Sequence, residues 1–260
     1  MGCRLERSRQ WAIRCVHESQ MHEQNCFITL TYSDEFLPEN GSLQLKHFQD
    51  FMKRLRFHVG GGIRFFHCGE YGENFGRPHY HACIFGYDFD DKKLWKVNNG
   101  YPLYTSNFLS SLWPFGYSSI GAVTFESAAY VARYIMKKVT GDAANKHYLV
   151  YDRGTGEIFG ERKPEYITMS RRPGIGKPWF DKFATDVYPD DFVVLNFKKM
   201  KPPRYYDGLF EIQAPSDMQR IKTQRVLFSK EHVDNNTSVR LRVRERVKLA
   251  QIKSLIRKLL

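Results

Sequence analysis

The chain has 260 residues, enough for one large domain or for one domain with an appendage. Hydrophobic residues make up 42% and charged residues 26%, which excludes a disordered, collagen-like or purely coiled-coil chain. Lys and Arg number 40 against 28 Asp and Glu, so a polyanionic partner is expected, most commonly nucleic acid. No apolar run reaches the roughly 18 residues of a membrane span, and the N-terminus lacks the apolar stretch of a signal peptide. We therefore expect a soluble protein with no membrane partner.

Apolar patterning in the first third predicts strands around one helix. CFITLTY at 26–32 is apolar and β-branched, which is typical of a buried strand. Helical spacing of apolar residues predicts a helix over 42–58, with Ser42 as its N-cap and the glycines at 60–62 ending it. Two further strands, 63–71 and 79–86, are joined by a short loop that contains glycine, so they are expected to pair as a hairpin.

The rest of the chain gives weaker signals. Residues 87–117 show no clear pattern except a short helix near 105–113. The elements predicted beyond them are a strand at 118–125, a helix at 126–139, a hairpin within 148–170 and a last helix with Leu249, Ile252, Ile256 and Leu259 on one stripe. From Asp217 onward, 12 Lys and Arg face only 4 Asp and Glu. We therefore predict a main domain over 1–200 and a basic, largely helical appendage over 201–260 that contacts DNA, packs on a partner or is merely solvated.

His79 and His81 flank Tyr80 on a predicted strand, so both imidazoles lie on one face. Folding the preceding loop places Glu70 across from His79 or diagonal to His81, with Glu70 and His67 on opposite faces. If Glu70 shares the histidine face, two imidazoles and a carboxylate form a set of three ligands with open positions. Such mixed ligation suits Mg²⁺ or Mn²⁺ bound together with a phosphate. The alternative is a surface carboxylate that pairs with a nearby arginine.

Tyr130 and Tyr134 lie four residues apart on the predicted helix and project from one face, with Lys137 close to it. A tyrosine is a poor nucleophile at neutral pH, but it can attack a phosphodiester when a metal polarises the phosphate and a cation favours phenolate. On its own, this spacing is more typical of a packed aromatic pair. Its significance depends on the neighbouring metal site and on the basic charge.

These segments together resemble a known family. RPHYHACIFG (77–86) resembles the histidine-hydrophobic-histidine motif of HUH endonucleases. YVARYIMKK (130–138) resembles the two-tyrosine motif of rolling-circle initiators. CFITLTY resembles the first motif of the same group, and the three motifs occur in the family's order. Three longer segments resemble the replication initiator of gokushovirus-type (Microviridae) single-stranded DNA phages: CRLERSRQWAIRC, CGEYGENFGRPHYH and SRRPGIGKPWF. The resemblance covers about residues 1–180.

The resemblance implies an α+β fold of the HUH endonuclease type, with a mostly antiparallel central sheet, the His-x-His on a central strand and flanking helices. It implies that His79, His81 and Glu70 hold Mg²⁺ or Mn²⁺ while Tyr130 or Tyr134 nicks DNA at a phage origin through a phosphotyrosine intermediate, assisted by Lys137. Single-stranded or supercoiled origin DNA, a host helicase, polymerase and single-strand-binding protein are the implied partners, and the host bacterial cytoplasm is the implied location. The residues expected to contact DNA are Arg77, Arg133, Lys138, Arg171, Arg172 and Lys177.

Three other readings compete with this one. A histidine-triad nucleotide hydrolase needs a third histidine where this chain has Cys83. A relaxase-like mobilisation enzyme shares the chemistry but usually carries its tyrosine near the N-terminus. A non-catalytic DNA-binding or packaging protein fits the charge but does not explain the ordered motifs.

Overall fold

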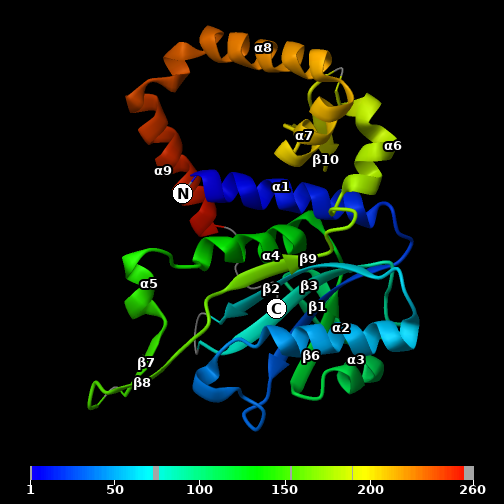
Figure 1. The fold of residues 1–260 in the computed structure, drawn as a ribbon, viewed down its shortest axis with the longest axis vertical. Helices are drawn as coiled ribbons and strands as arrows, with labels where there is room; N and C mark the ends of the chain where they lie inside the picture. The colour runs from blue at the N-terminus through cyan, green and yellow to red at the C-terminus, as the bar shows by residue number, and fades with distance from the viewer. Residues whose placement is uncertain (1, 73–75, 153, 189, 255–260) are drawn as a thin grey trace. The chain divides into compact units, whose positions relative to one another are not determined.

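The computed structural model describes residues 2–72, 76–152, 154–188 and 190–254, and no side-chain description extends to residues 2–4, 134–137 or 252–254. The chain divides into two compact units between Pro178 and Trp179 (Figure 1). The predicted boundary at residue 200 concerns a division of function and stays a prediction.

The first unit contains the strands that were expected to carry the chemistry. Its elements in chain order are α1 (Gly2–Ser19), β1 (Asn25–Tyr32), η1 (Glu39–Gly41), α2 (Leu45–Val59), β2 (Arg64–Tyr71), β3 (Pro78–Phe85), β4 (Lys93–Asn98), β5 (Tyr101–Thr105), α3 (Asn107–Leu112), β6 (Gly116–Gly121), α4 (Phe125–Lys137), α5 (Asp142–His147), β7 (Leu149–Tyr151), β8 (Ile158–Glu161) and β9 (Tyr166–Met169).

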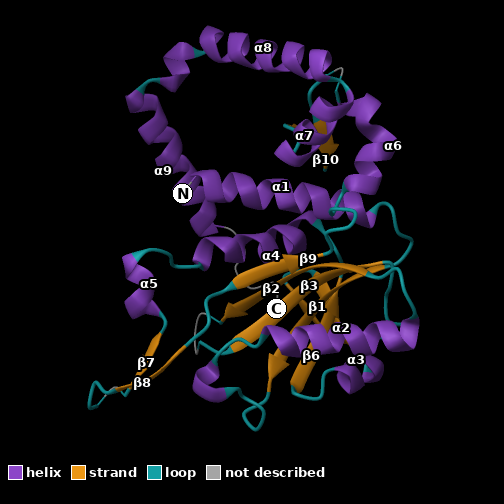
Figure 2. Cartoon of the chain, viewed as in Figure 1, coloured by secondary structure: helices purple, strands orange, loops and turns teal. Residues whose placement is uncertain are grey.

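A seven-stranded sheet in the order β4-β5-β6-β1-β3-β2-β9 forms the centre of this unit, and its paired strands are antiparallel. β1 lies in the middle because its apolar and β-branched residues are buried on both faces. β3, which carries His79 and His81, is also an interior strand. Figure 2 shows helices on both sides of the sheet. The predicted α+β fold class with a mostly antiparallel central sheet is confirmed.

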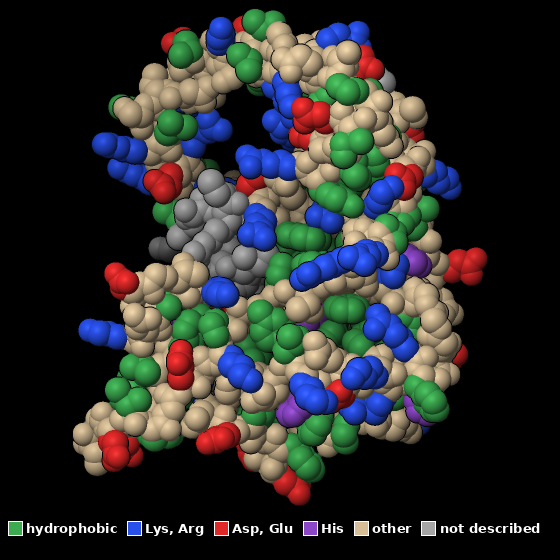
Figure 3. Space-filling view, viewed as in Figure 1, with side chains coloured by type: hydrophobic (Ala, Val, Ile, Leu, Met, Phe, Trp, Pro, Cys, Tyr) green, Lys and Arg blue, Asp and Glu red, His purple; other side chains and the backbone are tan. Residues whose placement is uncertain are grey.

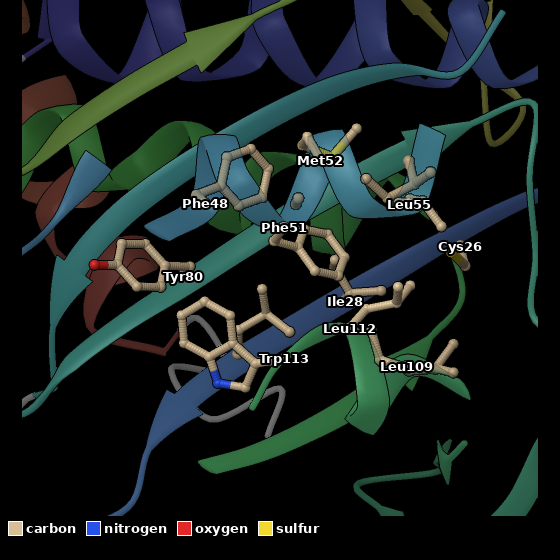
Figure 4. Close-up of a cluster of buried hydrophobic side chains, with 14 of the residues drawn as sticks. Cys26, Ile28, Phe48, Phe51, Met52, Leu55, Tyr80, Leu109, Leu112 and Trp113 are labelled. Carbon is tan, nitrogen blue, oxygen red and sulfur yellow. The ribbon is translucent and has the colours of Figure 1, made fainter. Parts of the chain in front are cut away.

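One face of the sheet packs an aromatic core against α2 and α3. Tyr80 and Trp113 lie in this cluster beside Phe48 of α2 (Figure 4). Two buried hydroxyls satisfy each other there, since the Tyr32 and Tyr80 Oη atoms lie 2.8 Å apart and the Gln44 backbone N–H donates to Tyr80 at 2.7 Å. Desolvation raises the pKa of Tyr80 to about 12. Tyr80 is therefore a core residue, as its place between the two histidines predicted.

α1 and α4 cover the opposite face of the sheet. Trp11 of α1 stacks on Phe66 of β2 with ring centroids 4.9 Å apart, and the Ser8 hydroxyl donates to the Ala129 carbonyl of α4 at 3.2 Å. The buried Glu18 fixes the end of α1, because it accepts from the Gly176 N–H at 2.5 Å and from the Arg64 guanidinium. Burial alone would raise the pKa of Glu18, but its hydrogen-bond donors hold that pKa below the ordinary value.

Several local predictions differ from the structure. α2 begins at Leu45 with Gln44 before it, so the prediction of Ser42 as the N-cap is wrong. The Ser42 hydroxyl instead accepts the Lys163 backbone N–H at 3.0 Å, which connects Ser42 to the segment between β8 and β9. The end of α2 is as predicted, since Gly60 follows with φ +96°. The patternless 87–117 region contains the β4–β5 hairpin as well as α3, and α1 was not predicted at all.

The second unit is helical apart from one small hairpin. Its elements are the rest of α6 (Lys177–Val187), β10 (Val193–Leu195), β11 (Lys198–Met200), α7 (Arg204–Gln213), α8 (Pro215–Glu231), η2 (Val233–Asn236) and α9 (Ser238–Ser254). The Arg225 guanidinium joins α8 to Asp191 and Asp207, with contacts of 2.5–2.9 Å. Figure 3 shows Lys and Arg side chains spread over the visible face of the molecule. None of the described helices is both long and apolar enough to cross a membrane.

Candidate functional site

The predicted ligand residues lie on one face of adjacent interior strands. Glu70 of β2 is directly opposite His79 of β3, so both side chains leave the sheet on the same side. His81 follows two residues later on that side and lies diagonal to Glu70. The His81 Nε2 and Glu70 Oε1 atoms are 3.1 Å apart, and the two histidine ring centroids are 6.3 Å apart. His67 lies on the other face, as parity predicted.

A second pair of polar residues supports the histidines from β1. Thr29 is directly opposite His81 and Thr31 is directly opposite His79. In each pair the threonine Oγ1 lies 2.9 Å from the histidine Nδ1. Each imidazole is therefore held at Nδ1, with its Nε2 directed away from the threonine.

α4 brings Tyr130 over this face. The helix begins cleanly because Thr124 and Ser127 form a reciprocal capping box. Packing of α4 across β2, β3 and β9 places the Tyr130 ring edge-on to His81, with centroids 5.2 Å apart. The Arg133 guanidinium carbon lies 5.8 Å from the centre of the Tyr130 ring. Tyr134 and Lys137 belong to the same helix, but their side chains lie outside the described residues.

Burial is graded along the site. His81, Glu70 and Tyr130 are 1%, 3% and 8% exposed, whereas His79 and Thr31 are half-buried. On the neighbouring strand β6, Tyr117 pairs with Thr31 and is 71% exposed. Among the described side chains of the site, exposure is therefore greatest around His79.

Two of the three predicted ligand residues, Glu70 and His81, are in direct contact. The 3.1 Å between His81 Nε2 and Glu70 Oε1 matches two neighbouring ligands of a small cation, which lie about 3 Å apart when each bond is about 2.1 Å. Among the described residues, no three His, Cys, Asp or Glu side chains are grouped tightly enough to hold an ion by themselves. Mg²⁺ is commonly bound through one or two carboxylates, here Glu70, and completes its shell with water and phosphate. The donor atoms of Glu70 and His81 therefore fit such an ion, and His79 is the remaining predicted ligand.

Gly72 lies against the His79 side chain. A Cβ atom at this position would lie 2.8 Å from His79 Nε2, which is closer than side chains approach. The missing side chain leaves room for the imidazole where β2 ends. Sequence reasoning did not single out this glycine.

The predicted DNA contacts fall into separate groups. Arg77 lies two residues before His79, where it donates to the Tyr32 carbonyl at 2.9 Å and pairs with Asp34. Arg133 lies beside Tyr130, and Lys138 follows α4 as an exposed residue. The remaining three, Arg171, Arg172 and Lys177, follow β9 and lie far from Glu70.

The distance of this last group follows from register. β9 is antiparallel to β2 and ends opposite Phe66, and the Pro173 carbonyl accepts from Arg64. Arg64 and Glu70 are six residues apart on β2, which is about 20 Å at 3.3 Å per residue. The structure does not bring Arg171 and Arg172 to the site, so contact with DNA at these positions stays a prediction.

Sequence reasoning missed the two threonines. Thr29 and Thr31 have the same spacing as His79 and His81, and both pairs sit on predicted strands. This matching periodicity was the available signal, but using it requires knowing that β1 pairs with β3 in this register.

Comparisons with known proteins agree on one family. Residues 25–139, from β1 to just past α4, match the family model described as replication-associated protein ORF2/G2P. The chain is 36% identical over 239 residues to replication-associated protein VP4 of Bdellovibrio phage phiMH2K, covering 88% of this chain and 71% of the relative. It is 35% identical over 225 residues to replication-associated protein ORF2 of Spiroplasma virus 4, covering 81% and 66%.

A more distant relative extends the same pattern. Replication-associated protein ORF4 of Chlamydia phage 1 is 28% identical over 226 residues, which cover 84% of this chain and 53% of the relative. The chain thus spans between about half and seven tenths of these three relatives. No solved structure matches. The chain therefore belongs to the family of phage replication-associated proteins, as its resemblance to gokushovirus-type replication initiators predicted.

Proposed function

We propose that this replication-associated protein is a metal-dependent nicking and joining enzyme that starts rolling-circle replication at a phage origin. The observation that carries the proposal is the placement of the Tyr130 ring 5.2 Å from His81, while His81 contacts Glu70. A potential nucleophile, an imidazole and a carboxylate thus meet on one side of the sheet. The net positive charge of the chain provides the attraction for DNA.

The reaction assigned to this site is a transesterification. The phenolic oxygen of Tyr130 or Tyr134 attacks the scissile phosphorus, and the bond from phosphorus to the 3′ oxygen breaks. The tyrosine loses its proton and the departing 3′ oxygen gains one, so water is not consumed. The products are a 5′-phosphotyrosyl protein and a free 3′-OH, and reversal of the step joins a strand. The family resemblance assigns two tyrosines so that cutting and rejoining can alternate.

The other residues bind and orient. His79, His81 and Glu70 are the residues that would hold Mg²⁺ or Mn²⁺, and a bound ion of this kind polarises the phosphate for attack. Thr29 and Thr31 fix the planes of the two imidazoles. Arg133 places positive charge beside the Tyr130 ring, which favours phenolate, and Lys137 is assigned the same task by resemblance. We assign contact with the DNA backbone to Arg77, since it lies two residues before His79.

The substrate and partners follow from this chemistry. An unpaired strand, either single-stranded or exposed by supercoiling, presents a backbone that can enter the site. The 260 residues contain no G-x-x-x-x-G-K-[ST] motif, so we assign unwinding to a host helicase or to supercoiling. A host polymerase would extend the 3′-OH and a host single-strand-binding protein would cover the displaced strand. The expected location is the host bacterial cytoplasm.

The decisive experiment is a search for a covalent adduct. The protein is mixed with Mg²⁺ or Mn²⁺ and with single-stranded or supercoiled DNA from its own replicon, and an SDS-resistant protein–DNA band is sought on a denaturing gel. We expect an adduct that requires the metal and disappears when Tyr130 and Tyr134 are both changed to Phe. The two single variants then identify the residue that cuts first.

Tyr117→Phe is the matched control. Tyr117 lies on the same sheet face but two strands from His79, so its loss of a hydroxyl should leave adduct formation unchanged. DNA binding without an adduct, across both metals and both DNA forms, would favour the non-catalytic DNA-binding alternative instead.

A further inference from the structure

Three histidines in the sheet share the same cross-strand support. His81 is opposite Thr29, His79 is opposite Thr31, and His67 of β2 is opposite Thr168 of β9. In each pair the threonine hydroxyl lies 2.9–3.0 Å from the histidine Nδ1. The first two pairs lie on the site face and the third lies on the core face.

A hydroxyl partner has a property that carboxylates and carbonyls lack. It can donate to a bare Nδ1, and it can also accept from a protonated Nδ1. A carboxylate or a carbonyl can only accept, and so fixes the proton on Nδ1. A threonine therefore keeps the imidazole plane fixed while leaving its tautomer free to change.

His81 has a reason to use both tautomers. Its Nε2 lies 3.1 Å from Glu70 Oε1, so a hydrogen bond between them places the proton on Nε2 and makes the Thr29 hydroxyl the donor to Nδ1. A cation bound to Nε2 needs a bare nitrogen. The ring proton must then reside on Nδ1, and the Thr29 hydroxyl becomes its acceptor. Neither arrangement leaves a nitrogen of His81 without a partner.

We propose that Thr29 is a positioning residue that lets His81 change between a closed metal-free form and an open metal-binding form by reversing a hydrogen bond, with the imidazole plane unchanged. Thr31 makes the same contact with the Nδ1 of His79. In the closed form Glu70 accepts from His81, and in the open form both are available as ligands. This inference rests on the proposed function, because it assumes that the site holds a divalent cation.

The core-face pair provides an internal comparison. His67 is fully buried, stacks on Phe48 with centroids 3.4 Å apart, and its Nε2 has no hydrogen-bond partner. An unpartnered buried N–H is rarer than an unpartnered acceptor, so we expect the proton on Nδ1, donated to Thr168. No exchange of partners is open to this histidine.

The direct test is a nitrogen NMR measurement on the full chain at one fixed neutral pH. Long-range ¹H–¹⁵N spectra of histidine-labelled protein report which ring nitrogen carries the proton. We expect His81 to carry it on Nε2 without metal and on Nδ1 after Mg²⁺ is added, while His67 stays on Nδ1 throughout. The same tautomer of His81 in both samples, or protons on both nitrogens in the metal-free sample, would overturn the proposal.

Isosteric variants test the role of the hydroxyl. Thr29→Val keeps the shape but leaves Nδ1 unpaired, so Mn²⁺ affinity measured by electron paramagnetic resonance should fall roughly 10–100-fold. Thr29→Ser should restore it, and Thr168→Val should leave it unchanged. Circular dichroism checks that each variant is folded.

The outcomes separate the two proposals. An unmodified chain that binds neither Mn²⁺ nor Mg²⁺ contradicts the proposed metal-dependent function. A chain that binds Mn²⁺ normally but is insensitive to Thr29→Val retains that function and contradicts the role given to the threonine.

Discussion

His81 and His67 occupy neighbouring strands of one sheet, and each pairs with a threonine directly opposite and stacks on a phenylalanine ring, yet they differ in a further partner. His81 meets Glu70 and the edge of Tyr130. His67 meets the rings of Phe48 and Tyr80. Both are buried, so burial alone does not distinguish a functional histidine from a structural one. The difference lies in the third partner, which is a carboxylate on one face and an aromatic ring on the other.

The largest expected effect comes from changing the two histidines separately. His81→Gln should reduce the rate of adduct formation roughly 10²–10³-fold, because it removes a proposed metal ligand that would be worth several kcal/mol in the transition state. His67→Gln should leave that rate within a few-fold of normal and instead lower the urea midpoint. The rate of adduct formation and the urea unfolding midpoint of both variants check this prediction. Equal losses of activity would contradict the difference in role between His81 and His67.

Gly72→Ala tests the site face without touching a ligand. The added Cβ would lie 2.8 Å from His79 Nε2 and must displace the ring, so adduct formation should fall on the order of 10–100-fold with little change in thermal stability. Gly61→Ala is the matched control, since nothing lies within 4 Å of its added Cβ. If Gly72→Ala is fully active, His79 is not held in the position described.

Tyr80→Phe tests the core face between the two ligands. It removes the hydroxyl that bonds Tyr32 and receives the Gln44 N–H, so the free energy of unfolding should fall by about 1–3 kcal/mol. The rate of adduct formation should be unchanged, because the side chain points away from the site. Chemical denaturation and the adduct assay on the same preparation measure both quantities.

Acid should weaken the core through its neutral histidines. Desolvation holds the pKa of His67 well below its ordinary value and lowers that of His17 to about 3. Below about pH 6.5 these histidines therefore bind protons in the unfolded chain but not in the folded chain. The free energy of unfolding decreases as the pH falls from there toward 3. Each such histidine contributes about 1 kcal/mol of loss between pH 7 and pH 5.5.

Urea titrations at these two pH values measure that loss. In His67→Met, which keeps an apolar contact with Phe48, the difference between them should shrink by the same amount. An undiminished difference would show that His67 is already protonated or that other groups control the acid response.

Much of the site follows from short-range pattern. Alternation along 79–81 gives the two faces of β3, and the short loop before it fixes Glu70 opposite His79. Helical spacing predicts that Tyr130 and Tyr134 share a side of α4. These inferences need only neighbouring residues, which is why the structure agrees with the placement of His79, His81 and Glu70.

What could not be predicted depends on contacts distant in sequence. Thr29 meets His81 across 52 positions, because β1 enters the sheet between β3 and β6. Ser42 has the residue type of a helix cap but bonds the Lys163 N–H instead, so a tertiary contact overrides a local preference. β4 is exposed along almost its whole length, so no buried face produces a clear alternation in its sequence.

Because β1 lies between β3 and β6, one of its partner strands is synthesised much later than β1 itself. β1 ends at Tyr32, but its partner β6 ends at Gly121, about 90 residues later. At ribosomal rates of about 5–20 residues per second, one edge of this apolar strand waits roughly 5–18 seconds for its neighbour. During that interval a nascent chain offers an open sheet edge to any similar chain nearby. Fragments that stop before Gly116 should therefore aggregate. Early packing of β1 against β3 and α2 would cover part of this strand before β6 is made.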